Sequence, residues 1–215
     1  MAQNRPGLSN FRKKIWYIIA GTGVFLLFLT GMQYAKRLQL QQEIAEKILR
    51  FHVLANSDTE ADQNLKLAVR DAVGSKMGAL LSGASSKEEC ETIINNHINE
   101  IVATAMQVVA KEGYNYGVQA SLSDVDFPVK TYGSYTFPAG RYEALEVVIG
   151  EGAGHNWWCV MYPNMCFSGS VYEVVDEEAE ESLQEVLSPE EYEAVLQSGE
   201  YEVQFKYLTF LNDLR

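Results

Sequence analysis

The glycine-rich segment 150–159 holds the side chains whose types and spacing could do chemistry. Cys159 could serve as a nucleophile with His155 as its base, which is the pairing that a cysteine hydrolase uses. On an extended strand four residues span about 13 Å, so these two side chains would share a face but meet only at a bend. No orienting Asp or Asn can be assigned, and the glycines lack the Gly-Lys-Ser/Thr of a phosphate loop. A hydrolase is therefore an alternative with an incomplete site.

The two tryptophans of this segment allow two other interpretations. Neighbouring residues of a strand point to opposite faces, so one of Trp157 and Trp158 is expected in the core and the other facing out. Tryptophan is also among the residues most enriched at binding hot spots. Core packing and contact with a partner protein both stay open for this pair.

Cysteine usage predicts a disulfide and no metal centre. Cys159 and Cys166 have Pro163 and Asn164 between them to turn the chain, so in an oxidising compartment they could close a short disulfide loop. Cys90 lies on a helical apolar stripe and is expected to be buried. The sequence has no Cys-x-x-Cys or Cys/His spacing typical of zinc, and we expect neither a metal nor a cofactor.

An uncharged apolar run from Ile15 to Met32 follows a basic stretch. A helix of that length spans about 27 Å, close to the hydrocarbon thickness of a bilayer. The excess of basic residues before it predicts residues 1–14 in the cytoplasm, 15–33 as a transmembrane or signal segment and 34–47 as a connector. The run is longer than that of a cleaved signal and no A-x-A site follows it, which favours an uncleaved anchor.

Charge divides the chain close to the same place. Residues 1–37 hold six basic residues and no acid, whereas the rest holds 11 Lys and Arg against all 29 Asp and Glu. So acidic a domain is a poor ligand for nucleic acid, because phosphate contacts need a basic surface. We expect residues 48–215 to form an exported domain. Its part 173–202 has 12 acids and no Lys or Arg, which indicates a solvated helical face or a surface for a basic partner.

Hydrophobic periodicity predicts the elements that position these residues. A strand at 48–55 leads into a helix whose start is marked by a Ser57–Glu60 capping box, or by Asp58. Ser86 caps a second long helix, which Gly113 ends. Four further strands are expected, at 116–122, 127–137, 142–149 and 156–162. A Ser188–Glu191 capping box marks the start of a helix from 189 to about 198, and a last strand is expected at 201–208.

The order of these elements predicts an α+β fold. Segments 127–137 and 142–149 are expected to pair as a hairpin across the turn Pro138-Ala139-Gly140. The whole domain is expected to be an antiparallel sheet with two long helices on one face, preceded by an N-terminal transmembrane or signal helix. His52 and His97 stand beside apolar neighbours and are expected in or near the core.

Two segments of the exported domain resemble the signature of the stage II sporulation protein R family. One runs from Arg50 to Asp58 and continues through Asp62-Gln63 and Leu65-Lys66 to residues 69–73, and the other covers residues 150–160. The resemblance extends over about residues 48–167. It implies a developmental signal of endospore-forming bacteria, made in the forespore and exported into the space between the forespore and mother-cell membranes.

The same resemblance implies a partner, the membrane-embedded aspartic protease called stage II sporulation protein GA, which cleaves pro-sigma-E when triggered. No catalytic residue comes with the family. We therefore expect binding that shifts the protease toward its active state, which requires different affinities for its two states. The expected contact residues are Asn56, Ser57 and Asp58, and His155, Asn156, Trp157 and Trp158. A cell-envelope structural protein is the remaining alternative.

Overall fold

The computed structural model describes residues 6–165 and 177–196, which belong to two compact units, Met1–Leu40 and Gln41–Arg215. The first unit consists mainly of helix α1 (Pro6–Lys47), whose last turns belong to the second unit. Within the described residues, α1 is the helix that is long and apolar enough to cross a membrane. Its large apolar side chains between Ile15 and Met32 are exposed, which is consistent with a membrane anchor or a signal sequence.

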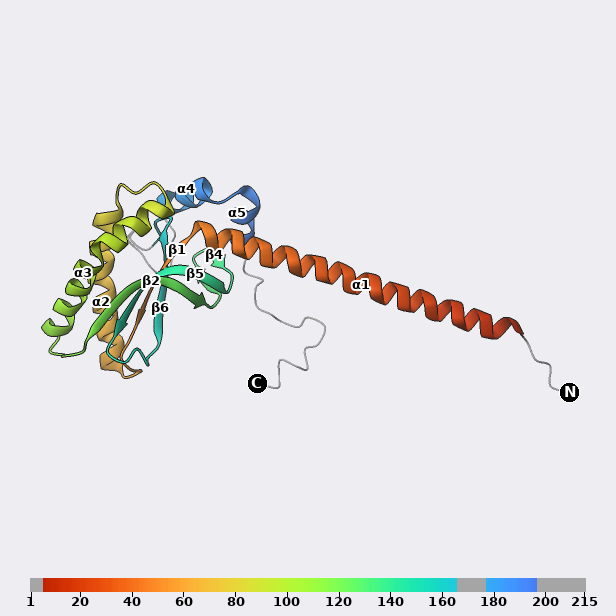
Figure 1. Cartoon of the computed structure of the whole chain (residues 1–215), viewed down its shortest axis with the longest axis horizontal. Coiled ribbons are helices and arrows are strands. Elements are labelled where there is room, and N and C mark those ends of the chain that lie inside the picture. Colours follow the sequence, from red (N-terminus) through yellow and green to blue (C-terminus); the bar gives the residue numbers. More distant parts are fainter. Residues whose placement is uncertain (1–5, 166–176, 197–215) are drawn as a thin grey trace. The chain divides into compact units, whose positions relative to one another are not determined.

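The second unit is built on a four-stranded sheet in the order β2-β5-β1-β6 (Figure 1). The strands are β1 (Leu49–Leu54), β2 (Val118–Phe127), β5 (Gly140–Ile149) and β6 (Asn156–Tyr162). β5 runs antiparallel to β2 and parallel to β1, and β1 runs antiparallel to β6. The sheet is therefore mostly antiparallel, which confirms the predicted α+β class.

Helices α2 (Glu60–Leu81) and α3 (Lys87–Lys111) cover one face of this sheet (Figure 1). The strand residues that point to this face alternate with those that point away, as a pleated strand requires. Phe51 and Val53 of β1 and Leu145 of β5 pack with Val69 of α2 and Ile101 of α3, all fully buried. This cluster is the main hydrophobic core.

One predicted strand pairing is wrong. Residues 127–137 do not form one strand against 142–149, because β5 pairs with β2 along its whole length, from Val118 opposite Ile149 to Phe127 opposite Gly140. The intervening chain instead forms a small hairpin of β3 (Lys130–Tyr132) and β4 (Tyr135–Phe137). Gly133 has φ 55 and so supplies the left-handed conformation that reverses the chain there.

The helix ends follow the predicted caps in part. Ser86 caps α3 by accepting from Glu89 N, and Gly113 with φ 83 follows its end, as predicted. The N-cap of α2 is Thr59, not Ser57 or Asp58. The prediction failed because the side chains of Ser57 and Asp58 are committed to Asp62 and His155.

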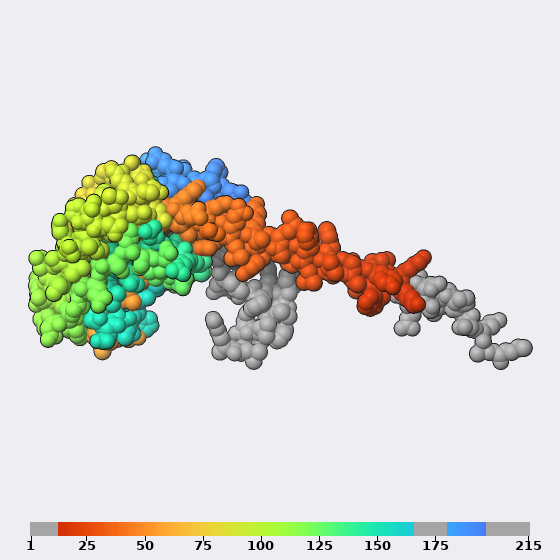
Figure 2. All heavy atoms as spheres, in the orientation of Figure 1, coloured from red at the N-terminus to blue at the C-terminus, as the bar shows by residue number. Residues whose placement is uncertain are grey.

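Two short acidic helices, α4 (Glu177–Val186) and α5 (Pro189–Leu196), pack on the domain (Figure 2). α4 lies beside the loop that joins α2 and α3, and α5 packs on β4. The predicted Ser188–Glu191 capping box is present, with Ser188 N donating to Glu191 Oε2 at 2.5 Å. Glu191 also pairs with Lys47 at 2.6 Å, and the hydroxyls of Tyr192 and Tyr135 lie 2.8 Å apart. The predicted strand at 201–208 lies outside the described residues.

Candidate functional site

The two motif segments meet where β1 ends and β6 begins. Gly154 N donates to Ala55 O at 3.0 Å, and Ala153 N donates to Asn56 O at 3.2 Å. The Asn56 side chain extends the contact, because its Oδ1 accepts from Glu151 N at 3.1 Å. We call residues 56–62 and 150–156 the motif corner.

Two glycines make this approach possible. A Cβ on Gly154 would stand 2.2 Å from the main-chain oxygen of Ser57, which cannot move without displacing the loop. Gly150 has φ +60, and a Cβ there would stand 2.2 Å from Asn56 Oδ1. The glycine-rich segment is therefore required by close packing of two loops rather than by a phosphate ligand.

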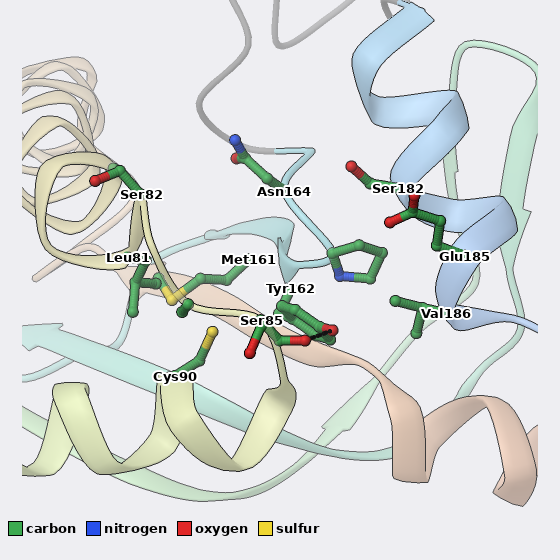
Figure 3. Close-up of a pocket in the computed structure, with 13 residues that line it drawn as sticks. Leu81, Ser82, Ser85, Cys90, Met161, Tyr162, Asn164, Ser182, Glu185 and Val186 are labelled. Carbon is green, nitrogen blue, oxygen red and sulfur yellow. Dashed lines mark hydrogen bonds between the residues drawn. The ribbon is translucent and has the colours of Figure 1, made fainter.

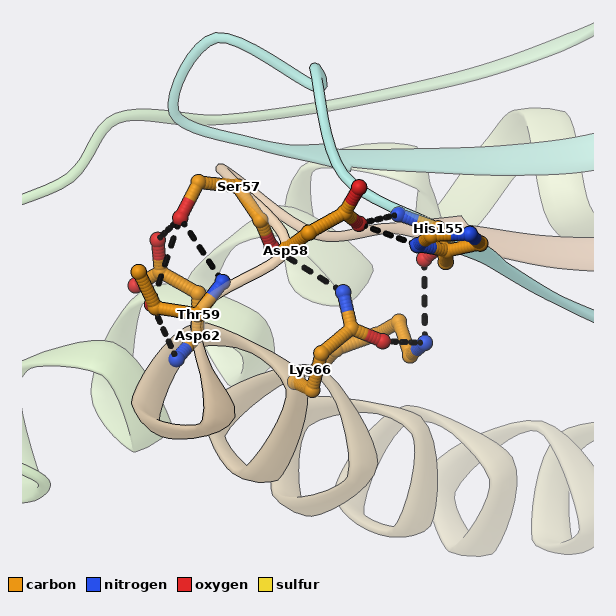
Figure 4. A network of polar contacts seen from close by, with 7 residues as sticks. Ser57, Asp58, Thr59, Asp62, Lys66 and His155 are labelled. Carbon is orange, nitrogen blue, oxygen red and sulfur yellow. Dashed lines mark hydrogen bonds and ion pairs between the residues drawn. The ribbon is translucent and has the colours of Figure 1, made fainter.

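Asp58 and His155 form the exposed part of the motif corner (Figure 4). His155 N donates to Asp58 Oδ1 at 2.6 Å, and the ring Nδ1 contacts the same oxygen. These hydrogen bonds, the main-chain one first, lower the pKa of Asp58 below its ordinary value. Since the His155 side chain is 79% exposed, the carboxylate fixes the imidazole while the ring faces solvent.

The first turns of α2 hold the motif corner from below (Figure 4). Lys66 Nζ donates to His155 O at 2.9 Å and to Gln63 Oε1 at 2.5 Å, while Gln63 Nε2 donates to Ser57 O at 3.0 Å. Ser57 Oγ donates to the buried Asp62 carboxylate at 2.6 Å, and this bond helps to lower the pKa of Asp62. One helix thus ties both loops together.

Sequence reasoning missed this supporting role of Asp62, Gln63 and Lys66. All three fall in the first motif segment, and the available signal was their spacing. Residues three and four apart on a helix are neighbours, so Asp62 and Lys66 share a face directly after the polar turn.

The structure separates the two tryptophans. Trp157 points to the helix side, where it meets Phe51 edge-on at 5.5 Å and lies under the Arg70 guanidinium at 5.2 Å. It is 8% exposed and belongs to the core, so it does not offer a contact surface. Trp158 is half-buried on the opposite face and stacks on His52 at 4.9 Å. Asn156 is likewise half-buried, opposite Leu54.

The cysteines do not provide a nucleophile for His155. Cys159 is 1% exposed and disulfide-bonded, so the Cys159–His155 hydrolase interpretation is wrong. Cys166, its predicted partner, lies outside the described residues. Cys90 is free and buried as predicted, and burial raises the pKa of its thiol to about 11.

A cavity of about 280 Å³ lies at the opposite end of β6 from the motif corner (Figure 3). Cys90, Met161 and Tyr162 line one side, and Glu185 and Val186 of α4 line the other. The Tyr162 hydroxyl donates to Ser85 O at 3.1 Å and closes part of its rim. No group of three His, Cys, Asp or Glu side chains in the described ranges could hold a metal ion.

Fold and site together define an α+β domain that follows an apolar helix in the sequence, with its motif residues assembled into one polar corner. The family model of stage II sporulation protein R (spore_II_R) matches residues 45–172, and the chain belongs to this family. Stage II sporulation protein R of Bacillus subtilis (strain 168) is 40% identical over 124 residues, which are 58% of this chain and 55% of that relative. The chain thus spans about half the length of the curated relative. No solved structure matches. Family membership supports a role in sporulation.

Proposed function

We propose that this chain is an exported sporulation signal that activates stage II sporulation protein GA, the membrane-embedded aspartic protease that processes pro-sigma-E to sigma-E. Family membership supports the sporulation role, and the observation that carries the rest is the motif corner. Polar side chains from two segments that are distant in the sequence together form one polar surface there. The Asp58–His155 contacts in particular lie at the solvent boundary, which suits recognition by a partner.

The mechanism is binding with unequal affinity for two states of the protease. A ligand shifts an equilibrium only by its differential affinity, so the motif corner must fit the active state better. The tethered loops favour this, because a surface already held in place loses little conformational entropy when it binds. The contact residues are Asn56, Ser57, Asp58, His155, Asn156 and Trp158. Trp157 is left out because it is buried in the core.

The apolar helix and the charge division support the location that this proposal requires. Residues 1–14 stay in the cytoplasm of the forespore, residues 15–33 anchor the chain in its membrane or serve as its signal, and the domain faces the mother-cell membrane. The exposed apolar side chains of α1 support this arrangement, since they need a lipid or a translocation channel to cover them.

The test removes the gene and follows pro-sigma-E processing. Loss of the chain should block processing, and full-length protein expressed in the forespore should restore it. A variant without residues 15–33 should fold but fail to restore processing, because it stays in the cytoplasm. A cell-envelope structural protein should instead be needed during growth as well as during sporulation. Normal processing without the gene would rule out the proposed function.

A further inference from the structure

The sheet face opposite α2 and α3 carries a buried cation that pairs with no carboxylate among the residues that the structure describes. Arg50 of β1 points to this face and its side chain is fully buried. Its Nη2 donates to the Tyr132 hydroxyl at 3.1 Å. Its Nε and Nη1 have no hydrogen-bond partner in the part of the chain that the structure describes. Buried arginines ordinarily have a carboxylate or several acceptors, so this arrangement is unusual.

Aromatic rings surround the guanidinium instead. Its carbon lies 4.4 Å from the Phe127 ring centroid, 5.0 Å from that of Tyr142 and 5.3 Å from that of Phe137. Ring faces attract a cation but are neutral, so within the described part of the chain no negative charge is paired with the guanidinium. The positive potential of Arg50 therefore reaches the surface above this cage.

A second cation stands beside the cage. Lys130 of β3 is half-buried, and its Nζ lies 6.0 Å from the Trp158 ring centroid. The acid that the described strands place on this face is Glu146, whose Oε2 lies 3.0 Å from Nε2 of the neutral His52. Arg50 and Lys130 thus give a positive pole to a domain that is strongly acidic as a whole.

Apolar surface that the described elements leave partly exposed adjoins this pole. Leu54, Val148 and Trp158 are half-buried side chains on neighbouring strands of the same face. Among the described elements, the long helices cover the other face, and the β3–β4 hairpin covers the part of this face around Arg50 and reaches the edge of Trp158. The patch is continuous with the motif corner, because Leu54 stands opposite Asn156 in the sheet.

We propose that this open face binds an apolar segment of the partner protease that carries an acidic side chain, whose carboxylate pairs with Lys130 above the uncompensated charge of Arg50. The proposal rests on the proposed function and names the chemistry of its partner. Trp158 packs against the apolar part of the segment. The carboxylate is attracted by both cations, which selects an acidic segment over a neutral one.

The test is co-purification of the full-length chain with stage II sporulation protein GA, both produced in a host that does not sporulate. Lys130→Glu should lower the amount of bound protease at least about tenfold, since it reverses a charge at the centre of the contact. Lys130→Arg should retain binding because it keeps the charge. Lys111→Glu is the matched control, an equal charge reversal at the exposed end of α3, and should bind like the unmodified chain.

Thermal unfolding of each variant shows whether it folds, and Lys130→Gln replaces Lys130→Glu if that variant does not. Equal binding by folded Lys130→Glu or Lys130→Gln and the unmodified chain would overturn the open-face site but leave the proposed function intact. Equal losses in Lys130→Glu and Lys111→Glu would also overturn it, because the effect would then reflect overall charge. Failure of the unmodified chain to bind would count against the proposed function itself.

Discussion

Asp58 and His155 are 97 residues apart in the sequence and share two contacts in the structure, one from the His155 main-chain nitrogen and one from its ring. A single carboxylate oxygen therefore fixes both the position of the β6 loop and the orientation of an exposed imidazole. The two motif segments act as one surface because of this contact.

Gly154→Ala should separate the two loops of the motif corner. The added Cβ would meet the Ser57 main-chain oxygen at 2.2 Å, so we expect a loss of about 1–3 kcal/mol in the free energy of unfolding from overpacking. Gly117→Ala is the control, since nothing lies within 4 Å of a Cβ there. Urea unfolding measures both. Equal stability of the two variants would show that the loops are not held in this close contact.

Alanine at the two neighbouring tryptophans should have different effects. Trp157→Ala removes a core side chain and should lower the free energy of unfolding by about 3–5 kcal/mol. Trp158→Ala removes a half-buried ring and should cost less stability but weaken binding to the protease. Urea unfolding and co-purification separate the two effects. A larger loss of stability in Trp158→Ala than in Trp157→Ala would contradict the assignment of faces.

Acid should destabilise the domain through His52. Burial, with the charge of Arg50 adding to it, lowers the pKa of His52 to about 4. Glu146 Oε2 lies 3.0 Å from Nε2 but makes no hydrogen bond with it. The pKa of His52 in the folded state lies below the unfolded value near 6.5. The stability of the domain is therefore unaffected by His52 above pH 6.5, where the imidazole is neutral in both states, and it decreases as the pH falls from 6.5 toward 4.

The expected loss over this pH range is about 3 kcal/mol in the free energy of unfolding. His52→Gln should remove that dependence, whereas His97→Gln, on the half-exposed side of α3, should keep it. Urea unfolding at pH 7 and at pH 4.5 measures the difference. An unchanged pH dependence in His52→Gln would mean that the imidazole is not buried in its neutral form.

Thiol mapping should find one free cysteine. Cys159 is disulfide-bonded and Cys90 is free, so alkylation of the denatured, unreduced chain should label Cys90. If Cys159 pairs with Cys166, reduction should release those two together and lower the free energy of unfolding by about 2 kcal/mol, the value typical of a short loop. Labelling of Cys166 without reductant would contradict the predicted pair.

The sequence predicted the elements better than their pairing. Apolar alternation identified β1, β5 and β6, and the caps at Ser86 and Ser188 marked two helices correctly. The sequence predicts one strand at 127–137 because the reversal within it depends on a single residue, Gly133. Which strand lies beside β5 is decided by long-range packing, which local patterns do not record.

The sequence predicts the residues of the candidate site in two separate segments, and the structure shows that these segments are in contact. Asp58 and His155 were both named, but no sequence pattern reveals a contact between residues 97 apart. Thr59 was overlooked as the N-cap because Ser57 and Asp58 match the same preference. The side chains of Ser57 and Asp58 bind Asp62 and His155 instead, and Thr59 is the N-cap.

The measurement that tests the account most directly is pro-sigma-E processing in a host that does not sporulate, with stage II sporulation protein GA, pro-sigma-E and the full-length chain produced together. The unmodified chain should cause cleavage, and Glu112→Gln, an exposed acid at the end of α3, should act like it. Asp58→Asn and His155→Ala should each reduce cleavage about tenfold, as loss of a central contact does. Full cleavage with both variants, while they remain folded, would contradict a signalling surface built on the Asp58–His155 contact.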